Sequence, residues 1–159
     1  MELVKATQNH LKEFILLDKE FLAYHQALGI DKQYKMQKVK SLSKRYFEKE
    51  FKKRLAKRNK FFYFATFDNK IVGYIYGYIE KLPPLFRLQH IGYLDCIIVC
   101  GAYRKKNVST FLKKEFFTWL RKKSVSLCQI HVAVKNTTTH KIYEHWGFKP
   151  DQYRLIKKL

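Results

Sequence analysis

The sequence contains few cysteines and few acidic residues, and both shortages restrict what the protein can be. It has 3 cysteines in 159 residues. An odd number argues against a framework of disulfides. Cys96 and Cys100, four positions apart on one predicted strand, would lie roughly 13 Å apart, which is too far to bridge. We therefore expect reduced thiols that pack in the core.

Long apolar segments are also missing. The longest apolar run without a charge spans residues 71–79, which is too short to cross a bilayer. The N-terminal residues MELVKATQ do not have the pattern of a signal peptide. We expect a soluble cytoplasmic protein that folds as a single domain over residues 1–159.

Several familiar catalytic motifs are absent from the sequence. It has no glycine-rich Walker loop, no HExxH motif, no CxxC pair and no serine in the setting of a nucleophile elbow. His140 and His145 are five positions apart and do not share a face of a helix. We therefore predict no metal site.

The shortage of acidic residues leaves a large positive charge. The chain has 33 Lys and Arg against 13 Asp and Glu, for a formal net charge of +20. Such a charge attracts nucleotides, nucleic acid, acidic protein surfaces and anionic lipid. The excess is greatest between Lys32 and Lys60, where 13 basic residues face only Glu48 and Glu50. This segment is either a solvated basic face or a nucleic-acid site.

At the centre of the chain, a strand pattern is followed by a basic loop and an amphipathic helix. Residues 93–99 are rich in β-branched and aromatic side chains and are too few for a typical helix, so they predict a buried strand. Over residues 108–122 the apolar side chains recur with the period of a helix. Arg104, Lys105 and Lys106 precede this helix, where unpaired N–H groups and the helix dipole favour anions. The loop is therefore a predicted phosphate site.

The same periodicities predict the other elements. Strands are expected over residues 3–6, 61–67, 71–82, 127–134 and 153–157, and helices from a cap at Gln8 or Asn9 to Gly29, over residues 43–58, and from a cap at Thr137 or Thr138 to His145. Residues 31–42 are expected to form a loop.

For two helices, the sequence predicts which side chains are buried and which are exposed. In the second helix, we expect Tyr46, Phe47, Phe51 and Leu55 to face the core. In the first helix, Asp18 continues the apolar stripe, and we expect a partly exposed carboxylate there.

Three tyrosines alternate along one predicted strand. Tyr74, Tyr76 and Tyr78 would share one face of the sheet. Stacked tyrosines on a basic protein can bind bases, whereas tyrosines at strand period also pack under a helix. The sequence leaves both interpretations open.

The strand, loop and helix at the centre carry a motif. The run VCGAYRKKNVSTFL resembles the cofactor motif V-x-P-x-Y-R-G-K-G-x-G of the GNAT superfamily, the acyl-CoA-dependent N-acetyltransferases. The matching residues are Val99, Tyr103, Arg104 and Lys106, and the departures are Gly101 for proline, Lys105 and Asn107 for glycine, and Ser109 for Gly or Ala.

A second match lies downstream. In NTTTHKIYEHWGF, Asn136, Tyr143, Gly147 and Phe148 fit the family pattern N-x(6)-Y-x(3)-G-F. The resemblance implies an α/β fold with a GNAT-like mixed, mostly antiparallel sheet flanked by helices and a splayed parallel strand pair.

The resemblance also implies acetyl-CoA as cosubstrate, without a metal. Of the substituted glycines, Asn is the residue that best tolerates a left-handed backbone and Ser adds a hydroxyl donor, so the loop can keep its chemistry. By resemblance, the residues that hold the coenzyme are Ile98, Val99, Arg104, Lys105, Lys106, Asn107, Val108, Ser109, Thr110 and Asn136.

For catalysis, the resemblance assigns two residues. Tyr143 corresponds to the general acid that protonates the departing thiolate. Asp95 is the candidate general base, because it lies four residues before Val99 and would share a face with Tyr93, Ile97 and Val99. A buried ion pair is the alternative for Asp95. Glu80, His131 or a chain of waters could serve as the base instead.

The resulting prediction is direct transfer of an acetyl group from acetyl-CoA to a primary amine in a ternary complex. The acceptor amine, which an acidic partner could carry, and the oligomeric state are not specified by the sequence. The alternative is a nucleic-acid-binding module that uses the face between Lys32 and Lys60 on a degenerate, catalytically silent fold of the same family.

Overall fold

The computed structural model describes residues 1–29 and 42–157. Its centre is a five-stranded sheet in the order β1-β2-β3-β4-β5. The first three pairings are antiparallel and the last, between β4 and β5, is parallel. The strands are β1 (Glu2–Lys5), β2 (Lys60–Phe67), β3 (Lys70–Lys81), β4 (His90–Val99) and β5 (Cys128–Gln129). The predicted α/β fold with a mostly antiparallel sheet is confirmed.

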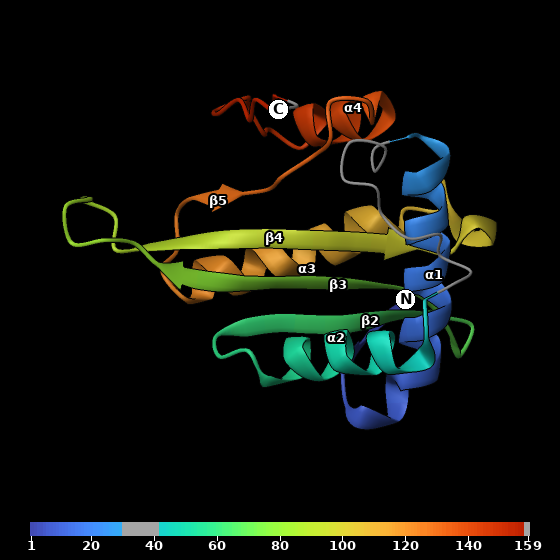
Figure 1. The fold of residues 1–159 in the computed structure, drawn as a ribbon. Helices are drawn as coiled ribbons and strands as arrows, with labels where there is room; N and C mark the ends of the chain where they lie inside the picture. Colours follow the sequence, from blue (N-terminus) through green and yellow to red (C-terminus); the bar gives the residue numbers. More distant parts are fainter. Residues whose placement is uncertain (30–41, 158–159) are drawn as a thin grey trace.

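Helices cover both faces of the sheet (Figure 1). One face packs against α1 (Leu11–Ala27) and α2 (Lys44–Ala56), around the fully buried Phe14, Phe47 and Phe51. The other face packs against α3 (Val108–Lys122), through residues such as Leu112 and Phe116. A fourth helix, α4 (Thr137–His145), follows β5. The predicted bounds of α3 are confirmed, and the aromatic residues form a core on each side of the sheet.

Two glycines in the sheet allow α3 to pack closely. A Cβ atom at Gly77 would lie 2.6 Å from the Phe116 ring, and one at Gly92 would lie 2.7 Å from the Leu120 side chain. Both distances are shorter than side chains tolerate, so a larger residue at either position would push α3 away from the sheet. The close contact fixes where α3 begins, at the end of β4.

The tyrosines of β3 pack under the helices. Tyr74 and Tyr76 are buried in the cluster beneath α1 and α2, and Tyr78 packs against the same cluster. Of the two interpretations that the sequence leaves open, the structure therefore supports packing. The second helix departs from the prediction at Tyr46, which is 40% exposed. Phe47 and Phe51 already fill the contact with the sheet, and Tyr46 lies beside Phe47 at the edge.

Asp18 is also placed differently from the prediction. It is only 5% exposed, because Tyr74 and Arg54 form a polar site for it inside the core. The Tyr74 hydroxyl donates to Asp18 Oδ1 at 2.7 Å. Burial raises the pKa of Asp18, although Arg54 and the bond from Tyr74 oppose the shift.

The helix caps differ from the predicted ones. Thr7, not Gln8 or Asn9, precedes a 3-10 turn (Gln8–His10), where its backbone N–H donates to His10 Nδ1 at 3.1 Å. At α4 the cap is Asn136, whose Oδ1 accepts from the Thr139 N–H at 3.3 Å, and not Thr137 or Thr138. An amide oxygen can cap a helix as well as a hydroxyl can. Ser43 caps α2 as expected.

The C-terminal part of the chain is less regular than predicted. β5 contains only Cys128–Gln129, not residues 127–134, because β4 pairs with it at just two positions. The predicted strand over residues 153–157 is wrong, since these residues form no strand and Tyr153 and Leu155 are 87% and 91% exposed. An apolar sequence without a neighbouring strand has no hydrogen-bond partners to make it extend.

Two further predictions concern the remaining segments. The loop expected at residues 31–42 lies almost wholly outside the described residues. Within the part of the chain that the structure describes, no helix is both long and apolar enough to span a membrane.

Candidate active site

The loop between β4 and α3 has a left-handed backbone at two positions where other loops of this shape carry glycine, although neither residue here is glycine. Lys105 and Asn107 both have positive φ angles, of 61° and 60°, in the left-handed region that favours glycine and then asparagine. Asn107 is the residue before the first turn of α3. The first N–H groups of a helix have no partner within the helix. Those of Val108, Ser109 and Thr110 therefore belong to the surface that the loop forms.

The cations of this loop are held by neighbouring side chains. Lys106 Nζ lies 4.9 Å from the centre of the Tyr103 ring. Arg104 Nη2 donates to Glu20 Oε1 at 3.0 Å, and its guanidinium lies 5.6 Å from the centre of the Tyr24 ring. Both cations belong to the loop that leads into the start of α3, where an anion is favoured.

The edge of β4 beside this loop is open. Pairing with β5 involves only Gly92 and Tyr93, whereas β4 continues to Val99. After β5 the chain runs away from β4 towards α4 (Figure 1). No strand of the described residues pairs with this edge at Ile98 or Val99, so the backbone groups that point away from β3 there can bind a ligand. The predicted splayed strand pair is confirmed.

A bulge changes the direction of Asp95. Tyr76 pairs with Cys96, whereas the next residue, Gly77, pairs with Leu94, so Asp95 is an extra residue in β4. Its Oδ2 lies 3.7 Å from Arg54 Nη2, on the face that α2 covers.

The bulge overturns the predicted grouping on β4. Ile97 and Val99 pack with α3, on the opposite face from Asp95. Tyr93 stacks with Tyr78, which belongs to the α1 and α2 side. The prediction that Asp95 shares a face with Tyr93 is therefore right, and the prediction that it shares one with Ile97 and Val99 is wrong.

Arg54 is a site residue that the sequence did not reveal. Its side chain is 16% exposed, and its Nη1 donates to the Tyr74 hydroxyl at 2.9 Å and to Cys96 Sγ at 3.4 Å. It lies among many basic residues that face solvent. The available signal was its spacing, since it follows the inward-facing Phe47 and Phe51 by seven and three positions.

An aromatic group lies next to Asp95. The rings of Tyr78 and Tyr93 are stacked with their centres 5.0 Å apart, and the Tyr93 hydroxyl lies 2.9 Å from His131 Nδ1. Burial raises the pKa of Tyr93, and the negative charges of Asp95 and then Glu80 add to the shift. Two carboxylates therefore lie near this hydroxyl, in a protein that has few.

Tyr143 and Asn136 lie on the β5 side of the opening between β4 and β5. The Tyr143 ring lies 5.5 Å from that of Trp146 and 5.8 Å from that of Phe148. Burial, and secondarily the charge of Cys96 in β4, raise the pKa of Tyr143. Asn136 is 5% exposed and its Oδ1 accepts from the Tyr24 hydroxyl at 3.4 Å. Asn136 thus bonds across to α1, whereas the ring contacts of Tyr143 are with residues of its own side.

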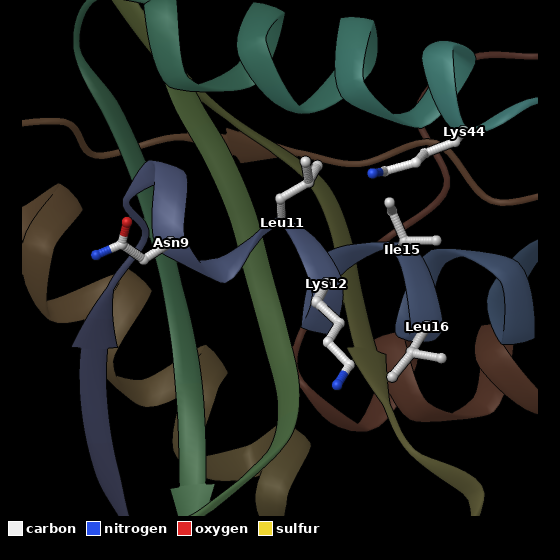
Figure 2. Close-up of a pocket in the computed structure, with 6 residues that line it drawn as sticks. All are labelled: Asn9, Leu11, Lys12, Ile15, Leu16 and Lys44. Carbon is white, nitrogen blue, oxygen red and sulfur yellow. The ribbon is translucent and has the colours of Figure 1, made fainter.

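Other possible sites contribute little. Among residues 1–29 and 42–157, no group of three His, Cys, Asp or Glu could hold a metal ion. A hollow lies between the start of α1 and the start of α2 (Figure 2). Its lining contains no predicted site residue and consists of Asn9, Leu11, Lys12, Ile15, Leu16 and Lys44.

A basic loop that follows β4, next to an edge that β5 leaves open, is the arrangement that the resemblance to the acyl-CoA-dependent acetyltransferases implies. The comparison with protein families agrees. The model of the acetyltransferase (GNAT) family matches residues 24–148. The chain belongs to this family.

Solved structures show the same fold. The tetramutant of the BH1408 protein from Bacillus halodurans has a TM-score of 0.85 at 14% identity, with 100% of both chains covered. The aminoglycoside 6'-N-acetyltransferase AAC(6')-IG from Acinetobacter haemolyticus has a TM-score of 0.74 at 19% identity, covering 100% of this chain and 98% of that one.

A third structure contains a coenzyme derivative. AAC(6')-Iy, in complex with the bisubstrate analogue CoA-S-monomethyl-acetylneamine, has a TM-score of 0.75 at 14% identity, covering 99% of this chain and 97% of that one. No curated protein matches the sequence.

Proposed function

We propose that the protein transfers an acetyl group from acetyl-CoA to a primary amine by direct attack in a ternary complex. The observation that carries this proposal is the loop from Arg104 to Asn107. It keeps two left-handed residues without glycine and leads into α3 beside the open edge of β4. A backbone conformation that costs energy in ordinary residues is kept where it has a use.

In this proposal the coenzyme binds along β4. The N–H groups from Lys105 to Thr110 would bind the pyrophosphate, with charge supplied by Arg104 and Lys106. Backbone groups at Ile98 and Val99 would bind the pantetheine arm, and an N–H there would stabilise the oxyanion of the thioester carbonyl. Asn136 would contact the arm from the other side.

Two side chains would move the protons. Asp95, with 35% of its side chain exposed, would accept a proton from the incoming ammonium group, directly or through water. The amine nitrogen then attacks the thioester carbonyl and loses its second proton to solvent, and the C–S bond breaks as the amide forms. Tyr143 would give its proton to the departing thiolate. Because its pKa is raised, Tyr143 stays protonated at neutral pH.

The acceptor would lie over the face that carries Asp95. Tyr78, Tyr93 and His131 form an aromatic surface beside that carboxylate, which suits an amine on a ring or an apolar body. Two of the similar structures are aminoglycoside acetyltransferases. At such low identity they suggest where an acceptor screen should begin, and amines on acidic partners belong in the same screen because of the net charge of +20.

Calorimetric titration with acetyl-CoA tests the coenzyme site. ATP serves as the anion control, and the titration is repeated at two salt concentrations. We expect saturable binding that is much tighter than that of ATP and depends only modestly on salt, and Arg104→Ala should weaken it by about tenfold. Binding no tighter than that of ATP and abolished by salt would overturn the proposal.

A second candidate function comes from the charge on α2. The helix and the two residues that follow it present exposed cations with few acids among them: Lys44, Arg45, Lys49, Lys52, Lys53, Lys57 and Arg58. We propose nucleic-acid binding by this face as the alternative. It predicts affinity for nucleic acid that falls steeply with salt and survives Arg104→Ala. Affinity that is lost with Arg104→Ala would instead place the anion at the loop between β4 and α3, residues 100–107, here called the coenzyme loop.

A further inference from the structure

Glu20 joins helix α1 to the start of the coenzyme loop. Its Oε1 accepts two hydrogen bonds, one from the backbone N–H of Gly101 at 2.8 Å and one from Arg104 Nη2 at 3.0 Å. Glu20 lies 81 positions before Gly101 and 84 positions before Arg104 in the sequence. A single carboxylate oxygen thus holds both Gly101 at the start of the loop and the loop's arginine.

The first of these bonds depends on a departure from the motif. Cys100 has φ −50° and ψ 136°, which is the conformation that a residue before proline adopts. Gly101 begins a 3-10 turn, where a proline would also fit. The backbone is therefore suited to the proline of the motif, but proline has no N–H to give to Glu20.

The Glu20 carboxylate lies close to the position that a side chain at Gly101 would occupy. A Cβ atom at Gly101 would lie 3.0 Å from Glu20 Oε1, so any side chain there would push the carboxylate away. Gly101 has no positive φ that would require glycine. Its lack of a side chain and its N–H group both serve the contact with Glu20.

Arg104 is engaged in ways that compete with a ligand. Besides Glu20, its Nε donates to the Val99 carbonyl at 3.4 Å and its guanidinium lies against the Tyr24 ring. Half of its side chain is exposed. The cation expected to bind phosphate thus has its charge balanced by Glu20, and the end of the open β4 edge is partly occupied.

We propose that Glu20 is a positioning residue that holds Arg104 and the start of the loop against α1 until the coenzyme phosphates take its place on Arg104. This role rests on the proposed function. A carboxylate next to a phosphate site repels the incoming phosphate, and its bond with Arg104 must be broken or shared. Glu20 therefore lowers coenzyme affinity in exchange for an ordered loop.

The same contacts reach the other side of the opening. Tyr24 lies one helical turn after Glu20 on α1, and its hydroxyl donates to Asn136 at 3.4 Å. Glu20 and Tyr24 of α1 thus contact Arg104 together, and Tyr24 also contacts Asn136.

The test measures acetyl-CoA affinity by calorimetry at two salt concentrations for six proteins, which include Arg104→Ala with and without Glu20→Gln. Glu20→Gln removes the charge and can keep the bond from Gly101. Gly101→Pro removes the N–H and pushes the carboxylate away while the charge stays. Glu48→Gln is the matched control, because it neutralises an exposed glutamate on α2 that pairs with Lys44. The wild type completes the set.

We expect Glu20→Gln to bind acetyl-CoA about three- to tenfold more tightly than the wild type at low salt, with a smaller gain at high salt. Gly101→Pro should change affinity in the same direction by less. In an Arg104→Ala background, most of the gain from Glu20→Gln should disappear. A merely structural role for Glu20 would not produce this dependence on salt and on Arg104.

Two negative results can be told apart. If the wild type binds acetyl-CoA but Glu20→Gln binds no more tightly than Glu48→Gln, or more weakly than the wild type, the role of Glu20 is overturned and the coenzyme site stands. If none of the proteins binds acetyl-CoA better than ATP, the proposed function is overturned and the role of Glu20 with it.

Discussion

The two sides of the opening between β4 and β5 are built differently. On the β4 side, α3 buries Val108, Leu112, Phe116 and Leu120 against the sheet. On the β5 side, the strand has two residues and α4 has no buried residue. The side that carries the coenzyme loop is therefore part of the core, whereas the side that carries Tyr143 is attached to it.

Beyond the contact of the Tyr93 hydroxyl with His131 at 2.9 Å, the side-chain hydrogen bonds that hold the β5 side to α1 and to Gly29 are long. The Tyr24 hydroxyl reaches Asn136 at 3.4 Å, and Lys135 Nζ reaches the Gly29 carbonyl at 3.5 Å. Apolar contact is made by the rings of Phe117 and Phe148, whose centres are 6.0 Å apart. Contacts of this kind contribute little each. The comparison teaches that the core fixes the position of the basic loop, while the proposed proton donor, Tyr143, lies on an element that is held by weaker contacts.

The largest expected effect is on the reaction, at the attached side. Tyr143→Phe removes the proposed general acid and keeps the ring contacts, so kcat should fall by about 10²- to 10⁴-fold while acetyl-CoA affinity stays within about twofold of the wild-type value. Tyr153→Phe, at an exposed position, is the control and should leave both unchanged. An unchanged kcat for Tyr143→Phe would remove Tyr143 from the mechanism.

A pair of truncations tests the difference in packing. Phe116 is 0% exposed and touches the rings of Phe61 and Trp119, so Phe116→Ala should lower the free energy of unfolding by about 3–5 kcal/mol. Phe148→Ala, on the attached side, should lower it by about 1 kcal/mol. Urea unfolding measures both. Equal losses would show that the two sides are equally part of the core.

Substitutions that affect the backbone of the coenzyme loop should change the free energy of unfolding by less. Asn107→Ala places an ordinary side chain at a φ of 60° and should lower the free energy of unfolding by about 1 kcal/mol. Asn107→Gly relieves the left-handed strain but makes the unfolded chain more flexible, so its change should stay within about 0.5 kcal/mol. Chemical denaturation of the two variants decides. A larger loss for glycine than for alanine would contradict the assigned conformation.

The caps of α2 and α4 should respond differently. Ser43 and Asn136 each accept a backbone N–H at 3.3 Å. Ser43→Ala should lower global stability by about 1 kcal/mol, because α2 packs on the core. Asn136→Ala should speed hydrogen exchange of the α4 amides with little change in global stability. If Asn136→Ala lowers global stability as much as Ser43→Ala, then α4 unfolds with the core.

The smallest expected effect is on the pH profile of the rate. In the proposed mechanism Tyr143 acts in its protonated form, and its pKa is raised above the usual value of 10.0. Its protonated form is therefore fully present below that value and is lost only at a higher pH. Once the acceptor amine is deprotonated, the rate should stay level through about pH 10. A decline centred near pH 8 or 9 would show that another group is the acid.

The sequence predicts the β4 side of the opening better than the β5 side. The bounds of α3 are correct because its apolar residues recur every three or four positions, and Val108, Leu112, Phe116 and Leu120 among them are buried. Residues 127–134 carry an equally strong strand pattern, yet only Cys128 and Gln129 pair. A pattern reports which side chains favour extended backbone, and it cannot report whether a second strand is present to bond with.

The site shows the same limit. The left-handed conformation of Asn107 was predictable, since few other residues tolerate it. The direction of the Asp95 side chain was not predictable. A bulge is a mismatch in the pairing of two strands, and the pattern of one strand does not show how it pairs with the other. Arg54 was hidden for a similar reason, as its partners come from three other elements.

Arg54 has a further consequence for how the protein folds. Its contacts join α2 to Tyr74 of β3 and to Cys96 and Asp95 of β4, and Tyr74 in turn bonds Asp18 of α1. If α2 detached alone, Asp18 would be left buried without its counter-ion, at a cost of several kcal/mol. The two N-terminal helices and the central hairpin are thereby coupled in one cooperative unit, which opens all together or not at all.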